Sequence, residues 1–391
     1  MMDASHIKHE FRKLHGTLPE LITQAPGRVN IIGEHTDYNG GLVMPAAINR
    51  YIWLAFGLSD NSKTSITALN ADENIQIDSF STSIDDANHW SAYLRAAALL
   101  LSEKGVNIPA FHCVFGGDIP IGSGLSSSAA LSCGAITGLS SLSGVHFTKR
   151  EVALMAQDLE RRYIGLECGI MDQMACLFGK EGEAMLLDCL SLEMESVSLS
   201  SINGIWFLVD SGIKHSLAAE SGYNERCRET AEGLEAIRKV FTNEIQFRDL
   251  NELHIQAIKK QLPTAAKRLR FFLKENARVR SMKRLVENGG SPEAIGAQLN
   301  DSHLGLQHDY DATCSETDYL AVLLRKSPGV YGARQVGGGF GGAVLVYAEK
   351  ALNNTQKTQL SEDYQVKTGA KCTFLMFSFA NGCQTQKIES S

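Results

Sequence analysis

Short, nearly uninterrupted apolar runs recur along the chain and are rich in β-branched and aromatic residues. They predict β-strands at residues 42–58, 204–210 and 343–347, the second of which reads Gly204-Ile205-Trp206-Phe207-Leu208-Val209-Asp210. No stretch of the sequence repeats another, and eight prolines are spread over the whole length. The strands are therefore expected to alternate with other elements and not to form a repeat array.

Between these runs the apolar positions take the spacing of helices. Thr148-Lys149-Arg150-Glu151 is a capping box, and one face of the helix that follows carries Val152, Ala156, Leu159 and Tyr163. Ser291-Pro292 predicts the start of a second helix, because serine is a good N-cap and proline suits the first helical position. The pattern as a whole predicts a protein that mixes helices and strands throughout.

A third helical stretch, residues 263–287, is strongly basic. Its eight cations are Lys267, Arg268, Arg270, Lys274, Arg278, Arg280, Lys283 and Arg284. Such a helix could follow the phosphates of a nucleic acid, or it could be an ordinary solvated face. The net charge of the chain is −7, which favours the solvated face. We therefore expect no nucleic-acid partner.

Composition narrows the class of protein further. The chain has 391 residues, of which 44% are hydrophobic and 21% charged, and this excludes disordered and collagen-like proteins. The longest apolar runs, such as residues 51–56, are far shorter than the roughly 20 residues of a membrane-spanning helix. The nine cysteines are scattered without a C-x-x-C pair, as expected for thiols in a reducing cytoplasm. These features predict a cytoplasmic protein without a membrane partner.

Glycine is slightly over-represented, and two clusters contain ten of the 35 glycines. The first cluster, residues 116–130, has four glycines within nine residues, then three consecutive serines, and leads into a run of small residues suited to a helix. Backbone N–H groups and a helix N-terminus at such a loop would form a phosphate cradle, although a glycine-rich hairpin that caps a helix has the same sequence. The loop is not a P-loop, because no Lys-Ser/Thr pair follows its glycines.

The second cluster, residues 332–342, contains a formal G-x-G-x-x-G match at Gly337, Gly339 and Gly342. A dinucleotide fingerprint should open a helix, but these glycines lead directly into the strand predicted at 343–347. A dinucleotide site is therefore excluded. A tight turn against a ligand or another loop and a turn that serves packing alone both remain open.

A third segment, residues 25–41, carries polar side chains between glycines. Arg28, Glu34, His35 and Asp37 lie within ten residues, a density of donors and acceptors that suits a polyhydroxylated ligand. The spacing matches no helical zinc pattern, and a polar surface turn is the other interpretation.

These residues resemble a known family. Residues 27–39, Gly-Arg-Val-Asn-Ile-Ile-Gly-Glu-His-Thr-Asp-Tyr-Asn, closely resemble the signature of galactokinases, a branch of the GHMP small-molecule kinases. Residues 122–130 are similar to the ATP-binding loop of that family, and residues 337–342 are similar to its third motif. The resemblance spans nearly the whole chain with the motifs in the family's order. It implies a two-lobed α+β GHMP kinase fold, with lobes at residues 1–200 and 201–391 and the active site in the cleft between them.

The resemblance also implies the catalytic pair. Asp172, in Gly169-Ile170-Met171-Asp172-Gln173, matches the aspartate that accepts the proton of the anomeric hydroxyl of the sugar. Arg28 matches its arginine partner, which would also counter charge on the transferring phosphoryl group. Asp172 could instead, or in addition, interact with a helix dipole.

Substrate and metal residues follow by the same similarity. The sugar would be held by Glu34, His35, Asp37, Gly169 and Tyr223, and the phosphates of ATP by Gly122, Ser123, Gly124, Leu125, Ser126, Ser127 and Ser128. Ser128 and Glu160 match the ligands of Mg²⁺. Trp90 is a candidate to stack on the adenine. Tyr223 as a plain surface tyrosine and Glu160 as an exposed helical carboxylate are the alternatives.

Departures from the family pattern are few. Ala343 stands where relatives often have cysteine, and Ser123 lies between the loop glycines. We expect a monomeric galactokinase that converts α-D-galactose to α-D-galactose 1-phosphate with MgATP. A kinase for N-acetylgalactosamine or arabinose is the nearest rival. A non-catalytic galactose sensor is less favoured, because the serine loop and Asp172 are intact.

Overall fold

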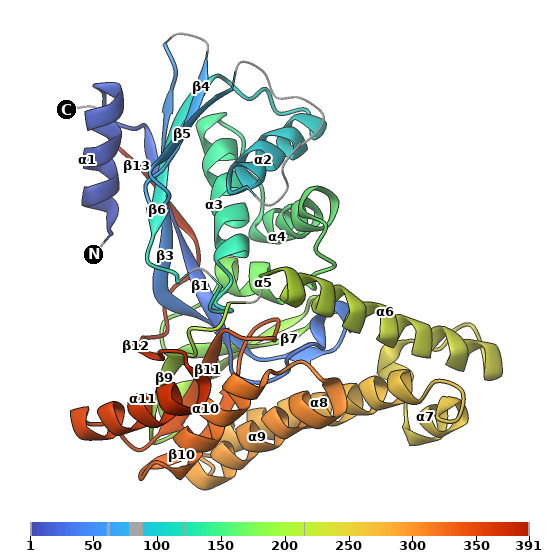
Figure 1. Ribbon diagram of the computed structural model, residues 1–391. Coiled ribbons are helices and arrows are strands. Elements are labelled where there is room, and N and C mark those ends of the chain that lie inside the picture. Colours follow the sequence, from blue (N-terminus) through green and yellow to red (C-terminus); the bar gives the residue numbers. More distant parts are fainter. Residues whose placement is uncertain (1, 61–62, 78–88, 121, 215, 390–391) are drawn as a thin grey trace.

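The computed structural model describes residues 2–60, 63–77, 89–120, 122–214 and 216–389, of which residues 216–220 are described as backbone only. Two lobes are stacked on one another, each built on its own sheet, with a small third sheet between them (Figure 1). Among the described residues, no helix has the length and apolar character needed to cross a membrane.

The N-terminal lobe is built on a six-stranded sheet. The strand order is β13 (Gln384–Lys387), β1 (Leu21–Asn30), β3 (Pro45–Leu58), β6 (Phe111–Gly117), β4 (Thr64–Ala68) and β5 (Glu73–Ile77). All neighbours are antiparallel except β4 and β6. The last strand, β13, pairs with β1, so the C-terminal end of the chain returns to the N-terminal lobe.

Helices cover both faces of this sheet. α1 (Ala4–His15) lies on one side and buries Ile7 and Phe11, which are four residues apart on one face. On the other side lie α2 (Ser91–Glu103), α3 (Ser127–Leu142), α4 (Lys149–Leu159) and α5 (Met171–Phe178) (Figure 1). α3 approaches closely because it has glycine at Gly138, where a Cβ would lie 2.2 Å from the ring of Phe56. This close packing fixes the N-terminus of α3 at the sheet.

The C-terminal lobe contains a four-stranded antiparallel sheet in the order β10 (Val330–Gln335), β11 (Ala343–Ala348), β9 (Ile205–Asp210) and β12 (Thr373–Met376). Its helices are α6 (Ser216–Val240), α7 (Glu252–Ile258), α8 (Pro263–Glu287), α9 (Pro292–Gly305), α10 (Ser315–Lys326) and α11 (Asn354–Thr368). The small sheet between the lobes consists of β2 (Leu42–Val43), β7 (Glu183–Asp188) and β8 (Met194–Ser198).

Five short helical turns complete the chain: η1 (Asp37–Asn39), η2 (Glu160–Ile164), η3 (Leu199–Ser201), η4 (Phe247–Asp249) and η5 (Leu306–Tyr310). Two of them, η2 and η5, have the wider π-helical geometry and extend α4 and α9 by one turn. Such π-turns are frequent at functional sites. η1 lies inside the polar segment that follows β1.

The elements predicted from local pattern are confirmed. The capping box at Thr148 and Glu151 is formed in both directions, and Ser291 caps α9 by accepting a hydrogen bond from the N–H of Ala294. The strands at 204–210 and 343–347 correspond to β9 and β11. The run at 42–58 is divided at Met44, so that β2 joins the small sheet while β3 stays in the large one.

The basic stretch is helical as predicted, but the prediction of a solvated face is wrong for Arg268. Its side chain is 3% exposed and forms ion pairs with Glu229 at 2.8 Å and with Asp311 at 2.7 Å. The physical reason is that α8 packs between α6 and α9, which buries one of its faces. Four further cations of α8 also have carboxylate partners, namely Arg270, Lys274, Arg278 and Lys283. Five of the eight cations of the helix therefore have carboxylate partners within the protein.

Candidate active site

An arginine and an aspartate that are 144 positions apart form a two-point ion pair at the centre of the molecule. Arg28 donates from Nε to Asp172 Oδ1 and from Nη2 to Asp172 Oδ2, each at 2.8 Å. β1 has a register shift between Pro26 and Arg28, and Asp172 lies in the first turn of α5. The third nitrogen of the guanidinium group, Nη1, donates to the carbonyl of Gly124 at 2.6 Å. Arg28 therefore links the predicted base to the predicted phosphate loop.

The loop before α3 has the backbone of an anion-binding turn. Gly122, Gly124 and Ser126 have positive φ angles of 76°, 75° and 60°, and α3 begins at the next residue. The hydroxyl of Ser126 donates a short hydrogen bond to Asp172 Oδ2. Ser126 is thus engaged with the predicted base in this structure, while its neighbours Ser127 and Ser128 occupy the first turn of α3.

The two glycine clusters pack directly against each other. A Cβ at Gly337 would lie 2.7 Å from the carbonyl oxygen of Gly124, and the N–H of Ala343 donates to the carbonyl of Ser123 at 3.1 Å. Of the two interpretations that the sequence left open for the second cluster, the structure supports a tight turn against another loop. The contact brings the N-terminus of α3 and the start of β11 to one place.

The predicted sugar segment surrounds the other side of the cavity. His35 has a positive φ of 58°, an uncommon backbone conformation for a residue with a side chain. Its Nδ1 lies 3.0 Å from the hydroxyl of Tyr38, and burial lowers the pKa of His35 to about 3, so that the ring is neutral. The carboxylate of Glu34 accepts a hydrogen bond from the N–H of Gly337 at 3.0 Å and forms an ion pair with Arg334 at 3.1 Å.

Asp37 lies against Gly169, the glycine predicted to face the sugar. A Cβ at Gly169 would be 2.0 Å from Asp37 Oδ2, so no larger residue fits there without displacing the carboxylate. Burial, reinforced by the nearby charges of Asp172 and Glu34, raises the pKa of Asp37 to about 7. Its charge therefore changes within the neutral pH range.

Tyr223 is not a plain surface tyrosine. Its ring centroid lies 5.4 Å from that of His35 and 5.3 Å from that of Tyr38. A Cβ at Gly338 would lie 3.3 Å from the Tyr223 ring. Burial raises the pKa of the Tyr223 hydroxyl well above its ordinary value, so the group is a neutral donor and acceptor. Tyr223 therefore closes the aromatic wall of the cavity.

Glu160 is likewise not an exposed helical carboxylate. It begins the π-turn η2, which directs its side chain inward, and the residue is 2% exposed. Gln173 donates to Oε1 at 3.1 Å and Ser128 to Oε2 at 3.3 Å. Burial, followed by the charge of Asp172, raises the pKa of Glu160 to about 7. No group of three or more His, Cys, Asp or Glu side chains in the described residues could hold a metal, so an ion at Glu160 would need oxygen atoms from a ligand.

One cavity, of about 240 Å³, unites these residues. Of the predicted site residues, its lining includes Arg28, Glu34, His35, Asp37, Gly122, Gly124, Ser128, Glu160, Gly169, Asp172 and Tyr223. Ser123 is buried beneath the loop, where its hydroxyl donates to the carbonyl of Pro120 at 2.7 Å, and Leu125 is buried as well. A separate apolar cavity continues from Ser127 and Ser128 and is lined by Trp90, Phe115 and Leu131.

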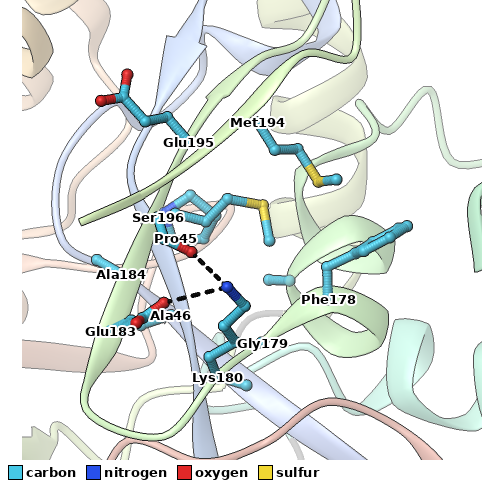
Figure 2. Close-up of a pocket in the computed structure, with 13 residues that line it drawn as sticks. Pro45, Ala46, Phe178, Gly179, Lys180, Glu183, Ala184, Met194, Glu195 and Ser196 are labelled. Carbon is cyan, nitrogen blue, oxygen red and sulfur yellow. Dashed lines mark hydrogen bonds and ion pairs between the residues drawn. The ribbon is translucent and has the colours of Figure 1, made fainter. Parts of the chain in front are cut away.

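A further cavity lies at the other end of α5 from Asp172, between that helix and the small sheet. Figure 2 shows Lys180 reaching across it, and the Lys180 ammonium donates to the hydroxyl of Ser196 at 2.9 Å and lies 3.6 Å from Glu183. Met194 and Phe178 form apolar walls (Figure 2). Its other carboxylate, Glu195, is paired with Lys283, and none of the predicted site residues lines the cavity. The cavity with Arg28 and Asp172 is therefore the candidate active site.

Sequence reasoning missed two cations at this site. Lys214, in the segment that follows β9, lies over the phosphate loop, where a Cβ at Gly122 would be 3.3 Å from its side chain. Arg334, on β10, is fully buried beside Glu34. Gly332-Ala333-Arg334 was visible at the start of the second glycine cluster, but nothing in the sequence tied its arginine to Glu34. For Lys214 the sequence offers no comparable signal.

Comparison with known proteins agrees with this geometry. Residues 9–58 match the model of the galactokinase galactose-binding signature, and residues 92–180 match that of the GHMP kinase N-terminal domain. The chain is 36% identical to a galactokinase of Thermotoga maritima over 362 residues, covering 92% of this chain and 99% of the relative. It is 34% identical to a galactokinase of Clostridium perfringens over 390 residues, covering 97% and 99%.

Solved structures show the same architecture. The galactokinase of Lactococcus lactis, complexed with galactose, superposes with a TM-score of 0.91 at 30% identity, covering 98% of this chain and 99% of that one. A mevalonate kinase of Methanococcus jannaschii, at 14% identity, shares the fold with a TM-score of 0.61. The chain therefore belongs to the galactokinase family, phosphotransferases with an alcohol group as acceptor, and has the two-lobed α+β fold of the GHMP kinases.

Proposed function

We propose that the protein transfers the γ-phosphoryl group of ATP to the C1 hydroxyl of α-D-galactose, giving α-D-galactose 1-phosphate and ADP. This reaction is the first committed step of galactose breakdown by the Leloir pathway. The observation that carries the proposal is the Arg28–Asp172 pair, which lies where the sugar segment meets the phosphate loop in one cavity. The galactose-complexed relative with the same fold supports the choice of sugar.

Asp172 acts as the proton acceptor. Its Oδ2 already accepts hydrogen bonds from Arg28 and Ser126, whereas Oδ1 accepts from Arg28 Nε alone. Oδ1 is therefore the oxygen with capacity for the proton of the anomeric hydroxyl. As that O–H bond breaks, the sugar oxygen attacks the γ-phosphorus in line and ADP departs. A carboxylate is a weak base, but phosphoryl transfer depends mainly on positioning and charge stabilisation.

Arg28 and the loop before α3 stabilise the charge on the phosphates. The Arg28 guanidinium lies against the loop, where it donates to the carbonyl of Gly124. Gly122, Ser123, Gly124, Leu125, Ser126, Ser127 and Ser128 surround the phosphates, which also meet the N-terminus of α3. Lys214 adds a second cation above Gly122. The apolar cavity beside Ser127 receives the adenine, with Trp90 in its wall.

Ser128 and Glu160 hold the Mg²⁺ that accompanies ATP. The residues fit such an ion, because both supply oxygen atoms and because a buried carboxylate whose pKa is raised to about 7 is stabilised by a cation. The bound ion would neutralise charge on the β- and γ-phosphates. Gln173 keeps Glu160 in place by donating to its other oxygen.

The sugar is held by Glu34, His35, Asp37, Gly169 and Tyr223. Support comes from the two carboxylates and the neutral aromatic wall that face the same cavity as Asp172. Carboxylates accept hydrogen bonds from hydroxyl groups, and the bare backbone at Gly169 leaves room beside Asp37. We further propose a monomeric, cytoplasmic enzyme with lobes at residues 1–200 and 201–391. The change from the small sheet to β9 near residue 200 supports that division, except that β13 returns to the sheet of the first lobe.

A coupled assay of ADP release across a panel of monosaccharides tests the proposal. We expect galactose-dependent turnover that exceeds turnover with N-acetylgalactosamine or arabinose. Faster turnover with either of those sugars would reassign the substrate. If galactose bound without any ADP release, the protein would instead be a sensor.

A further inference from the structure

The sugar segment between β1 and β2 is attached mainly to the C-terminal lobe, although it lies early in the chain. The N–H of Gly33 donates to Glu275 of α8 at 3.0 Å, and the N–H of Leu42 donates to Asn276 of the same helix at 2.7 Å. These bonds bind the backbone at each end of the segment. The side chain of Glu34 has its own attachment, on β10.

That attachment is Arg334, a large side chain with no exposed surface. Its Nη2 donates to the carbonyls of Asn30 and Ile31, and its Nη1 donates to the carbonyl of Gln335 at 2.9 Å. Nη1 also lies 3.1 Å from Glu34 Oε1. Among the described residues, Glu34 is the one carboxylate within ion-pair distance of Arg334. A buried guanidinium without a carboxylate partner is costly, so this pair compensates both charges.

One oxygen of the Glu34 carboxylate, Oε1, already has partners within the protein. Oε1 forms the ion pair with Arg334 Nη1 and accepts a hydrogen bond from the N–H of Gly337, while the residue lines the active-site cavity. A neutral sugar can donate hydroxyl hydrogen bonds to a buried carboxylate but brings no positive charge. The sugar therefore does not compensate the negative charge of Glu34, and Arg334 is the cation that the protein supplies for it.

We propose that Arg334 is a positioning residue of the sugar site, which holds Glu34 by its Oε1 atom and so presents the other carboxylate oxygen to a hydroxyl of the bound sugar. This inference rests on the proposed function, because it assigns Glu34 to the sugar. Arg334 touches neither sugar nor nucleotide. Its effect on the sugar passes through Glu34, while its bonds to the carbonyls of Asn30 and Ile31 hold the backbone, as the bonds to Glu275 and Asn276 do.

A double-mutant cycle on the KM for galactose tests this role. Arg334→Lys keeps a cation but loses the planar fork, and we expect the KM for galactose to rise about tenfold with little change in kcat or in the KM for ATP. Glu34→Gln removes the charge that Arg334 holds, and we expect a rise of similar size. Because both changes remove the interaction between Arg334 and Glu34, the rise in KM of the double variant should be well below the product of the two single rises. If the fold-changes in KM of the two single variants multiplied in the double variant, the proposal would be overturned.

Arg268→Lys is the matched control. Arg268 is buried to a similar degree in the same lobe, and its ion-pair partners are Glu229 and Asp311, not Glu34. We expect Arg268→Lys to lower the melting temperature. In the double variant with Glu34→Gln, the fold-changes in the KM for galactose should simply multiply. If Arg334→Lys does not fold, the KM of Glu34→Gln can be compared with that of the double variant Glu34→Gln/Arg334→Gln. In that double variant both members of the buried pair are neutral. Absence of galactose turnover in the wild type would refute the proposed function, whereas turnover without coupling would refute only the role of Arg334.

Discussion

Asp172 and Glu34 each lie against a buried arginine, whereas Asp37 and Glu160 face the same cavity with no arginine or lysine within ion-pair distance among the described residues. The first two have their charge compensated by the protein itself, through Arg28 and Arg334. The other two are buried without that compensation, and the pKa of each is raised to about 7. Their charge is instead stabilised by what binds beside them.

This difference suggests a division of labour. A carboxylate with a permanent cation keeps its orientation before any ligand arrives, as a base and a positioned acceptor must. A buried carboxylate without such a cation has a destabilised charge in the empty site, and that charge is stabilised when a ligand binds beside it. For Glu160 that ligand would be Mg²⁺, and for Asp37 it would be the sugar hydroxyls. The predictions that follow test the two kinds of carboxylate separately.

The largest effect is expected at Asp172. Asp172→Asn keeps the size of the side chain but removes the proton acceptor, so we expect kcat to fall by at least about 10²-fold. The dissociation constant for ATP, measured by calorimetry, should change little, because the asparagine keeps an oxygen atom that can accept the hydrogen bond from Ser126 of the phosphate loop. Near-normal turnover of this variant would show that another group accepts the proton.

A smaller effect is expected at Glu160. Glu160→Gln retains the hydrogen bond with Ser128 but loses the charge, so the Mg²⁺ concentration for half-maximal activity should rise about tenfold. Asp158→Asn is the matched control, because Asp158 lies two residues before Glu160, near the end of α4, but is paired with Arg162 on the surface. An unchanged Mg²⁺ requirement in Glu160→Gln would remove Glu160 from the metal site.

The comparison between the carboxylates also shows how far the sequence could predict this molecule. The bounds of α8 and the caps of α4 and α9 depend on neighbouring residues and were predictable. The motifs also indicated which side chains share the cavity. The pairing of Arg334 with the backbone of Asn30 was not predictable, because the two residues are 304 positions apart and only the assembled lobes bring them together.

The directions of the side chains within the site could not be predicted from the sequence either. The sequence placed Ser126 on the phosphates, whereas its hydroxyl donates to Asp172 in the structure. The π-turn that directs Glu160 inward has no sequence signal comparable to a capping box. The burial of Arg268 depends on the helices packed around α8, which a pattern along one chain segment does not specify. Local signals thus predicted elements, while long-range packing determined which charges are compensated.

A pH dependence should follow from Asp37. Its pKa of about 7 means that it is a carboxylate above pH 7 and is progressively protonated below it. The ionised fraction falls from about one half at pH 7 to about one eleventh at pH 6, so kcat/KM for galactose should fall about fivefold over that interval. Saturating MgATP is used throughout, so that the proposed metal site at Glu160 would stay occupied during the measurement. In Asp37→Asn the profile should be lower and flat in this range, and a wild-type profile that is itself flat would contradict the assignment.

The smallest effect concerns stability and has the opposite sign. The pKa of Asp37 is raised in the folded state, so its ionisation opposes folding, and this cost grows as the pH rises from about 4 to about 7 and is fully present above 7. Asp37→Asn removes the charge at constant size, and the melting temperature of the ligand-free protein should therefore rise by about 2 °C or more at pH 8. The gain should shrink as the pH is lowered toward 5. Glu34→Gln should instead lower the melting temperature, because it leaves Arg334 buried without its carboxylate. Equal shifts for the two variants would mean that the arginine partners do not distinguish the two kinds of carboxylate.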